Sequence, residues 1–283
     1  MKNRNRLFAI AGMLIVLAGS ACTQGGGPTA KESVPVTDEE KRAQGDAILK
    51  QMSDKLRSAQ AATFSTTESI DRVKRNNEKV HLNLARQIAV RRPDKMWFKT
   101  SGDRDLEFMY SGKMVTLVSH KDKVFGEVPA PPTLNETAEM ITAKYGISLP
   151  ISDLLSADPE QALKDEETKG GWNRRETLNG VVCNVLSYQH PAVDFSLWVP
   201  VSGDPLPQKM EITYKQRRGQ PSTTVTFKDW NLAPQLNDEM FARKVPEGYE
   251  GIAVIQRASA VISPEEAAET PPDVKEPAKT KSK

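Results

Sequence analysis

The feature that most restricts the fold of this sequence is a series of strand patterns in two blocks, with a helical stretch between them. In the clearest pattern, residues 80–90, apolar residues alternate with mostly polar ones, and Arg86 is the charged exception on the apolar face. Alternation of this kind predicts a strand with one buried face. Short turn signals separate further patterns. We expect strands at 63–74, 96–100, 106–110, 114–119 and 124–128 in the first block, and at 171–177, 181–188, 194–199, 208–215 and 223–230 in the second.

Two local signals predict hairpins between neighbouring strands. Asn76-Asn77 stands between the first two strand patterns, and Asn179-Gly180 stands between two strand patterns of the second block. Asn-Gly favours a tight two-residue turn, because both residues tolerate the positive backbone angles that such a turn needs. The Asn179-Gly180 turn is therefore the strongest hairpin signal in the chain.

Helical patterns precede and divide the strands. Thr37-Asp38-Glu39-Glu40 has the form of a capping box, and apolar residues recur at helical spacing from Ile48 to Ala59, which predicts a helix ending near Ala61. Pro129–Pro132 then interrupts the strands. We expect an insert of three helical stretches at 135–144, 152–155 and 159–163, and one last helical turn with Asn237 as its N-cap.

This order of elements predicts a mainly β protein with helices (α+β). We expect a strongly curved antiparallel sheet, or unclosed β-barrel, covered by the N-terminal helix and the helical insert. A sheet that wraps without closing tends to leave an apolar cleft under its cover, and ligands favour such sites. The candidate ligand-binding residues are apolar residues of the 80–90 strand and of the insert: Leu82, Leu84, Ile88, Leu134, Met140, Ile141, Leu154 and Leu155.

The N-terminus has the order of an export signal, with basic residues, an apolar run from Leu7 to Leu17 and a zone of small residues. The run would rise only about 16 Å as a helix, roughly half of a hydrocarbon core. Residues 18–22, Ala-Gly-Ser-Ala-Cys, resemble a lipobox, in which the cysteine receives diacylglycerol, although Gly19 stands where Leu is usual. We expect a signal peptide over 1–21 and lipidation of Cys22. The alternative is an ordinary secretory signal cut after Ala21.

The composition divides the rest of the chain. Residues 22–37 predict a flexible tether, 38–261 one domain, and 262–283, which are rich in Pro, Glu, Lys and Ala, a disordered tail. Removing residues 1–21 takes away three of the 39 basic groups and no acidic ones, so 36 basic groups face 37 acidic ones. This near-neutral balance argues against a nucleic-acid partner.

Motifs for catalysis and metal binding are missing from the sequence. His81, His120 and His190 are scattered, without a second His or Cys at ligand spacing. Cys183 lies in an apolar strand pattern and is expected to be a buried, inert thiol. We therefore expect no enzyme, no catalytic residues, no metal site and no cofactor.

Several stretches, in their order and spacing, resemble a family of predicted periplasmic proteins of unknown function. They cover about residues 42–251 and comprise RRPDK (91–95), YSGKMVTL (110–117), VPAPPTL (128–134), KYGISLPISDLL (144–155), NGVVCNVLSYQHPAVDFSLWV (179–199), PLPQKMEITYK (205–215), FKDWNLAPQL (227–236) and MFARKVPEGYEG (240–251). That family is similar in fold to the outer-membrane lipoprotein carriers and receptors of the LolA/LolB type. These hold acyl chains in an unclosed barrel lidded by helices. No functional residue of the carriers is carried over to this chain.

The resemblance and the ends of the chain together imply a lipid-anchored cell-envelope protein. Thr23, the residue after Cys22, is not the Asp associated with retention at the inner membrane, so we expect the outer membrane, with the domain facing the periplasm. The expected partners are the membrane, through the anchor, and a lipid or other hydrophobic ligand in the cleft. The alternative is a non-enzymatic interaction or sensor module that contacts an envelope protein and carries no lipid.

Overall fold

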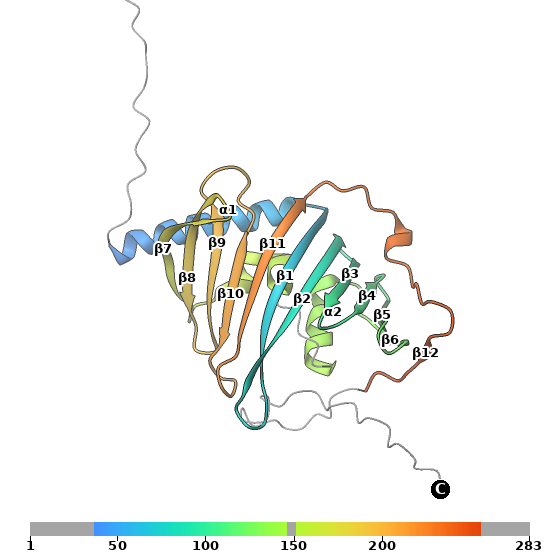
Figure 1. The fold of residues 1–283 in the computed structure, drawn as a ribbon. Coiled ribbons are helices and arrows are strands. Elements are labelled where there is room, and N and C mark those ends of the chain that lie inside the picture. Colours follow the sequence, from blue (N-terminus) through green and yellow to red (C-terminus); the bar gives the residue numbers. More distant parts are fainter. Residues whose placement is uncertain (1–36, 146–150, 256–283) are drawn as a thin grey trace, which may run out of the picture. The chain divides into compact units, whose positions relative to one another are not determined.

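The computed structural model describes residues 37–145 and 151–255 (Figure 1). The expected signal peptide, Cys22, nearly all of the tether and the C-terminal tail lie outside the described residues. Within these residues, no helix combines the length and the hydropathy that crossing a membrane requires.

The N-terminal helix α1 (Asp38–Ser58) starts at the predicted capping box. The Thr37 hydroxyl accepts a hydrogen bond from the Glu40 N–H, and the Glu40 carboxylate accepts one from the Thr37 N–H. This exchange satisfies two backbone donors that the first turn would otherwise leave unpaired. The predicted apolar stripe faces the protein interior, with Leu49, Met52 and Leu56 buried.

In the described part of the chain, twelve strands form one sheet in the order β12-β6-β5-β4-β3-β2-β1-β11-β10-β9-β8-β7. All neighbouring pairs are antiparallel except β12 and β6, which are parallel. The strands are β1 (Ala61–Val73), β2 (Lys79–Arg91), β3 (Lys95–Gly102), β4 (Leu106–Tyr110), β5 (Met114–Ser119), β6 (Val124–Pro129), β7 (Lys169–Leu178), β8 (Val181–Gln189), β9 (Val193–Pro200), β10 (Lys209–Tyr214), β11 (Ser222–Asn231) and β12 (Glu250–Gly251). Because β7 and β12 are separate edges, the sheet does not close, which confirms the predicted fold class.

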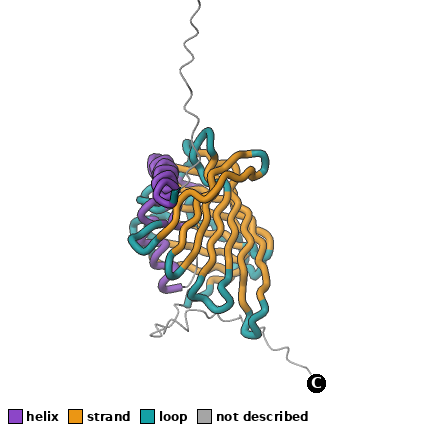
Figure 2. The backbone as a smooth tube through the Cα atoms, turned by 90° about the vertical axis from the view of Figure 1, so that its left-hand side faces the viewer, coloured by secondary structure: helices purple, strands orange, loops and turns teal. Residues whose placement is uncertain are grey.

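The helical insert lies between β6 and β7 in the chain. It comprises α2 (Leu134–Met140), a π-helical turn η1 (Ile141–Tyr145), α3 (Ser152–Leu155) and α4 (Pro159–Leu163). Figure 2 shows these helices and α1 gathered on one face of the sheet, the predicted cover. An ion pair between Lys164 and Asp46 joins the end of α4 to α1.

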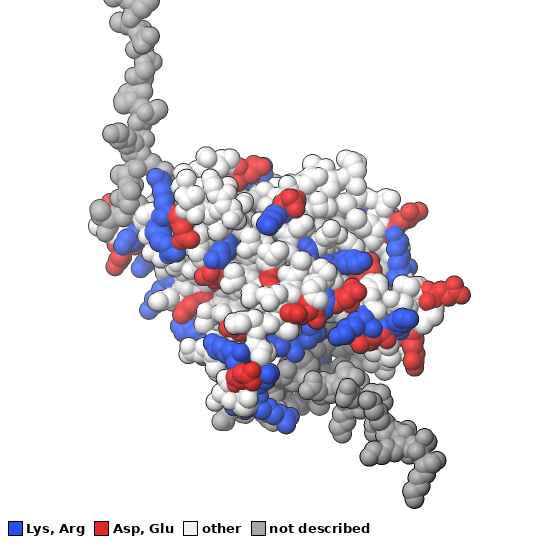
Figure 3. Space-filling view, in the orientation of Figure 1, with Lys and Arg blue, Asp and Glu red and all other residues white. Residues whose placement is uncertain are grey.

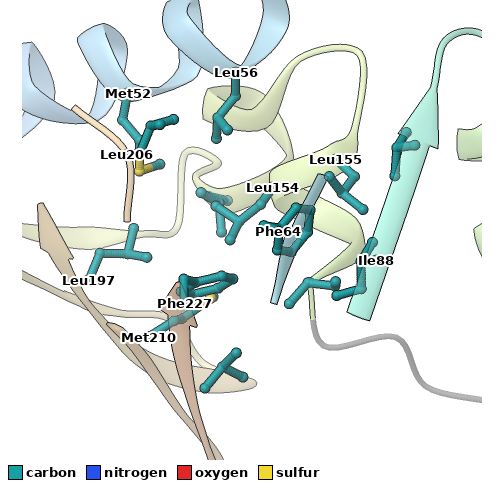
Figure 4. Packing of buried hydrophobic residues seen from close by; sticks show 14 of the residues in the cluster. Met52, Leu56, Phe64, Ile88, Leu154, Leu155, Leu197, Leu206, Met210 and Phe227 are labelled. Carbon is teal, nitrogen blue, oxygen red and sulfur yellow. The ribbon is translucent and has the colours of Figure 1, made fainter. Parts of the chain in front are cut away.

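The core fills the space between the sheet and its helical cover. Side chains of α1, α3, the loop between β9 and β10 and the inner sheet face meet in one cluster (Figure 4), which includes Met52, Leu56, Phe64, Ile88, Leu154, Leu155, Leu197, Leu206, Met210 and Phe227. Phe64 on β1 stacks on Trp230 of β11 with ring centroids 4.2 Å apart. The packing therefore joins the two blocks of strands at the middle of the sheet.

The segment after β11 returns across the outer face of the first block, an arrangement that the sequence patterns did not indicate. Its 3-10 helix η2 (Asp238–Met240) has the predicted N-cap, since the Asn237 side chain accepts from the Met240 N–H. Arg91 on β2 pairs with Asp238, and Phe241 is buried. Strand β12 then adds to the edge of β6.

Candidate functional site

The candidate site is a cavity of about 520 Å³ between the two halves of the insert and strand β3, which we call the insert cavity. Met96 of β3, Leu134 of α2 and Leu155 of α3 supply large apolar side chains to its wall. Its volume lies within the roughly 300–1,000 Å³ that small-molecule sites occupy.

The insert cavity is hollow because the helices around it present small side chains to each other. Ala138 on α2, Ala143 on η1 and Ala162 on α4 all line it, together with Ser152 and Ser156 at the two ends of α3. None of the three alanines is buried, because the cavity whose wall they form is open to solvent. Larger side chains at these positions would fill the space.

A second cavity of about 230 Å³, the sheet cavity, lies between the insert and strands β9 and β10. Phe195, Met210 and Ile212 form its sheet wall. The two cavities share four wall residues and therefore lie next to each other. These are Thr142, Ser152, Asp153 and Ala162.

Asp153 brings a carboxylate to the wall that both cavities share. The neighbouring Leu154 and Leu155 are buried in the core, and the Arg92 guanidinium donates a hydrogen bond of 2.8 Å to the Leu155 carbonyl. These contacts fix α3, and they turn Asp153 toward the cavities instead of the core.

The surroundings of Asp153 disfavour its charge. Desolvation by the surrounding protein raises the pKa of its carboxyl above the usual value, and a hydrogen bond from Ser152 opposes that shift. That bond is long, 3.4 Å from Oγ to Oδ1. Asp153 is nevertheless solvent-accessible, because it faces the open cavities. Among the described residues it forms no ion pair with a basic side chain.

The predicted ligand-binding residues fall into three groups. Leu134 and Leu155 line the insert cavity. Ile88, Ile141 and Leu154 are packed in the core, and the half-buried Met140 lies against it. Leu84 is buried and Leu82 half-buried on β2, and neither belongs to the core cluster or is among the described residues that line these two cavities.

The sequence patterns did not single out the small and polar cavity residues, nor Met96 and the sheet-wall residues Phe195, Met210 and Ile212. Ala143, Ser152, Asp153 and Ala162 carry no apolar periodicity, because they lie opposite the side of the insert that packs in the core. The sequence signal that could have identified them is the presence of small residues on the face of each predicted helix that lies opposite its apolar face. Cys22, the predicted lipidation site, lies outside the described residues.

Among the described residues, one group of possible metal ligands, Asp165, Glu167 and His190, has its ligand atoms close together. His190 Nε2 lies 3.3 Å from Asp165 Oδ2 and 3.6 Å from Glu167 Oε2, and both carboxylates are exposed. His190 Nδ1 accepts a hydrogen bond from the Ala192 N–H, which places the ring proton of the neutral histidine on Nε2. Nε2 is therefore a donor to the carboxylates and does not offer a free lone pair to a metal.

The fold of the described residues is an N-terminal helix and a helical insert on one face of an unclosed, mainly antiparallel sheet. The chain belongs to the DUF2092 family of predicted periplasmic proteins, whose family model matches residues 45–255. This confirms the family resemblance seen in the sequence. No curated protein matches the chain in sequence.

Solved structures of three proteins illustrate what this chain is similar to. LprF from Mycobacterium bovis is 12% identical, with 74% of this chain and 99% of that chain covered and a TM-score of 0.44. Lipoprotein LppX from Mycobacterium tuberculosis is 11% identical, with 68% and 97% covered and a TM-score of 0.38. A LolA superfamily protein from Nitrosomonas europaea is 10% identical, with 71% and 98% covered and a TM-score of 0.36.

Proposed function

We propose that this chain is a non-enzymatic, lipid-anchored protein of the cell envelope that shelters a hydrophobic or acyl-chain ligand in the insert cavity. The observation that supports the proposal is the cavity itself, about 520 Å³ with alanine, leucine and methionine side chains in its wall. A concave space of this size, with a mainly apolar wall and a few polar groups, is typical of small-molecule binding sites.

The energetics favour an apolar occupant. Each methylene that leaves water contributes about 0.8 kcal/mol, so ten methylenes contribute roughly 8 kcal/mol before the costs of association. Micromolar affinity for a long alkyl chain is therefore reachable without a charged contact.

The test is to fill the cavity from its wall. Ala138 lines the insert cavity, so Ala138→Trp should occupy it and weaken binding. Ala47, on the exposed side of α1, offers the matched control Ala47→Trp, which adds the same side chain away from the cavities. The chain from residue 22 onward, prepared without lipid, is titrated with the neutral fluorophore diphenylhexatriene. We expect saturable binding that Ala138→Trp weakens at least ten-fold and Ala47→Trp leaves unchanged. Absence of saturable binding to the folded chain would contradict the proposal.

The anchor is proposed on the sequence around Cys22. A single acyl chain holds a protein to a membrane only marginally, whereas the several chains of a bacterial lipoprotein cysteine hold it firmly. Cys22→Ser should therefore move the protein from the outer-membrane fraction to the soluble periplasm. Identical fractionation of the two forms would refute lipidation.

The alternative function, an envelope interaction or sensor module, has one observation in its favour. Val181, Val182 and Val201 are exposed where the β7–β8 hairpin meets the end of β9, and the Val201 N–H donates to the Val182 carbonyl. A small exposed apolar patch of this kind suits a protein partner. A nucleic-acid partner is disfavoured, because basic and acidic side chains are interspersed on the face shown in Figure 3.

A further inference from the structure

The charged side chains in the described walls of the two cavities are all acidic. The charged residues in their walls are Glu139, in the insert cavity, and Asp153, in both. Lys, Arg and His are absent from the described wall residues of both cavities. A ligand with an anionic head would bring a second negative charge next to Asp153, and repulsion in a partly desolvated space is costly.

Asp153 lies where the two cavities meet, because it lines both of them. The insert cavity extends from it toward Met96 on β3, and the sheet cavity extends toward Phe195 and Met210 on β9 and β10. A head group beside Asp153 therefore has apolar space on both sides for the chain that it carries.

The carboxylate has bonding capacity to spare. Among the described residues it accepts one hydrogen bond, from the neighbouring Ser152 onto Oδ1 at 3.4 Å. An ionised carboxylate can accept several hydrogen bonds through two oxygens. Desolvation by the surrounding protein raises the pKa of this carboxyl, and the hydrogen bond from Ser152 opposes that shift.

We propose that Asp153 recognises the head group of the ligand, and that this ligand is a long-chain amphiphile with a cationic amine head. The inference rests on the proposed function, since it assigns the polar end of the molecule whose chain fills the cavities. An ammonium beside Asp153 would form a charge-assisted hydrogen bond and neutralise the carboxylate, and it would replace water that the site now admits.

The experiment compares three sixteen-carbon probes that differ only in their heads: hexadecylamine, hexadecanol and palmitate. Each displaces diphenylhexatriene from the chain starting at residue 22, at pH 7.5 and below its aggregation concentration. We expect the amine to bind at least ten-fold more tightly than the alcohol, a difference of about 1.4 kcal/mol. Palmitate should bind most weakly.

Variants of Asp153 decide whether this residue is responsible. Asp153→Asn should reduce the affinity for the amine to that for the alcohol and leave the alcohol unchanged, while Asp153→Glu should keep the preference. Asp229 on β11 is exposed and is not among the residues that line the two cavities. Asp229→Asn is therefore the matched control for the loss of one negative charge. Thermal unfolding of each variant checks that it is folded, and Asp153→Ala replaces the Asn variant if that one is not.

The outcomes separate the two proposals. If all three probes bind equally, or if Asp153→Asn leaves the amine preference intact, the head-group assignment is overturned while the hydrophobic carrier stands. If neither diphenylhexatriene nor any of the sixteen-carbon probes binds, both proposals fall.

Discussion

Arg86 on β2 forms a buried ion pair with Glu68 on the neighbouring strand β1, on the inner face of the sheet two residues from Ile88 in the core. The side chain of Glu68 is 0% exposed and that of Arg86 is 11% exposed. Thr66 donates a hydrogen bond to Glu68, and Arg86 donates one to Thr100 of β3. The pair therefore belongs to a polar layer across three strands.

The first prediction concerns this pair. Arg86→Met should lower the free energy of unfolding by about 3–5 kcal/mol, because it leaves a buried carboxylate without its cation. The double variant Arg86→Met/Glu68→Leu should recover much of that loss. Urea unfolding of the single and double variants gives the coupling energy, and a single-variant loss below about 1 kcal/mol would show that the pair is not structurally important.

The second prediction compares two buried tyrosines. The hydroxyl of Tyr188 has no hydrogen-bond partner among the described residues, and burial raises the pKa of that phenol. The hydroxyl of Tyr110 donates to the Pro131 carbonyl at 2.6 Å. Tyr188→Phe should leave stability unchanged or raise it, because an unpaired buried hydroxyl costs about 1–3 kcal/mol, whereas Tyr110→Phe should lower it by about 1 kcal/mol. The opposite order in thermal unfolding would contradict the assignment.

The third prediction is a pH dependence at the site. The pKa of Asp153 in the folded protein lies above its ordinary value of 3.8, so its ionised form destabilises the fold. The stability that protonated Asp153 contributes is fully present below pH 3.8 and is lost as pH rises through the higher folded pKa. Asp153→Asn should therefore be more stable than the unsubstituted chain at neutral pH, and the difference should vanish in acid. Unfolding curves from pH 3 to pH 8 measure it, and a constant difference would exclude titration of Asp153 as its cause.

The fourth prediction concerns the contact between α1 and β7. A Cβ atom at Gly45 would lie 2.5 Å from the backbone of Gly171 and Trp172. Ala is a better helix former than Gly by about 1 kcal/mol, yet Gly45→Ala should destabilise the protein because the backbone of β7 blocks the added methyl group. The control Ala47→Gly, at an exposed position of the same helix, should cost only about 0.5–1 kcal/mol. Stabilisation by Gly45→Ala would show that the helix does not approach β7 this closely.

The fifth prediction concerns the thiol of Cys183. It is 0% exposed, and desolvation, with a smaller effect of Glu176, raises its pKa. Both effects suppress the reactive thiolate. In a Cys22→Ser background, labelling with a thiol reagent should be slow in the native protein and fast in denaturant. Rapid native labelling would be incompatible with burial.

Elements with local signals could be predicted from the sequence to within a few residues. The capping box at Thr37 and the turn at Asn179-Gly180 depend on neighbours only a few positions away, and Asn77 and Asn179 both have the positive φ that their turns need. The insert helices were also predicted, because each has its own apolar side. Arg86 was recognised as an exception on its strand.

Features that depend on distant partners could not be predicted. Strand β12 is two residues long and exists because Glu250 and Gly251 meet Val124 and Phe125. Nothing in the pattern around Arg86 identifies Glu68 as its partner. The cavities arise where small residues of separate helices face each other, and apolar periodicity reports only the side that packs.

The pairing of β1 with β11 has a consequence for the kinetics of folding. Thr66 on β1 pairs with Phe227 on β11, so the two blocks of the sheet join through residues from opposite ends of the domain. The first block can form local hairpins early, but the free edge of β1 must wait until β11 has been synthesised and brought to it. Closing a loop of this length is entropically unfavourable, and sheets rich in such contacts fold slowly. Until it closes, β1 presents unpaired backbone groups beside an uncovered apolar face, the state in which this chain is most open to aggregation or chaperone binding.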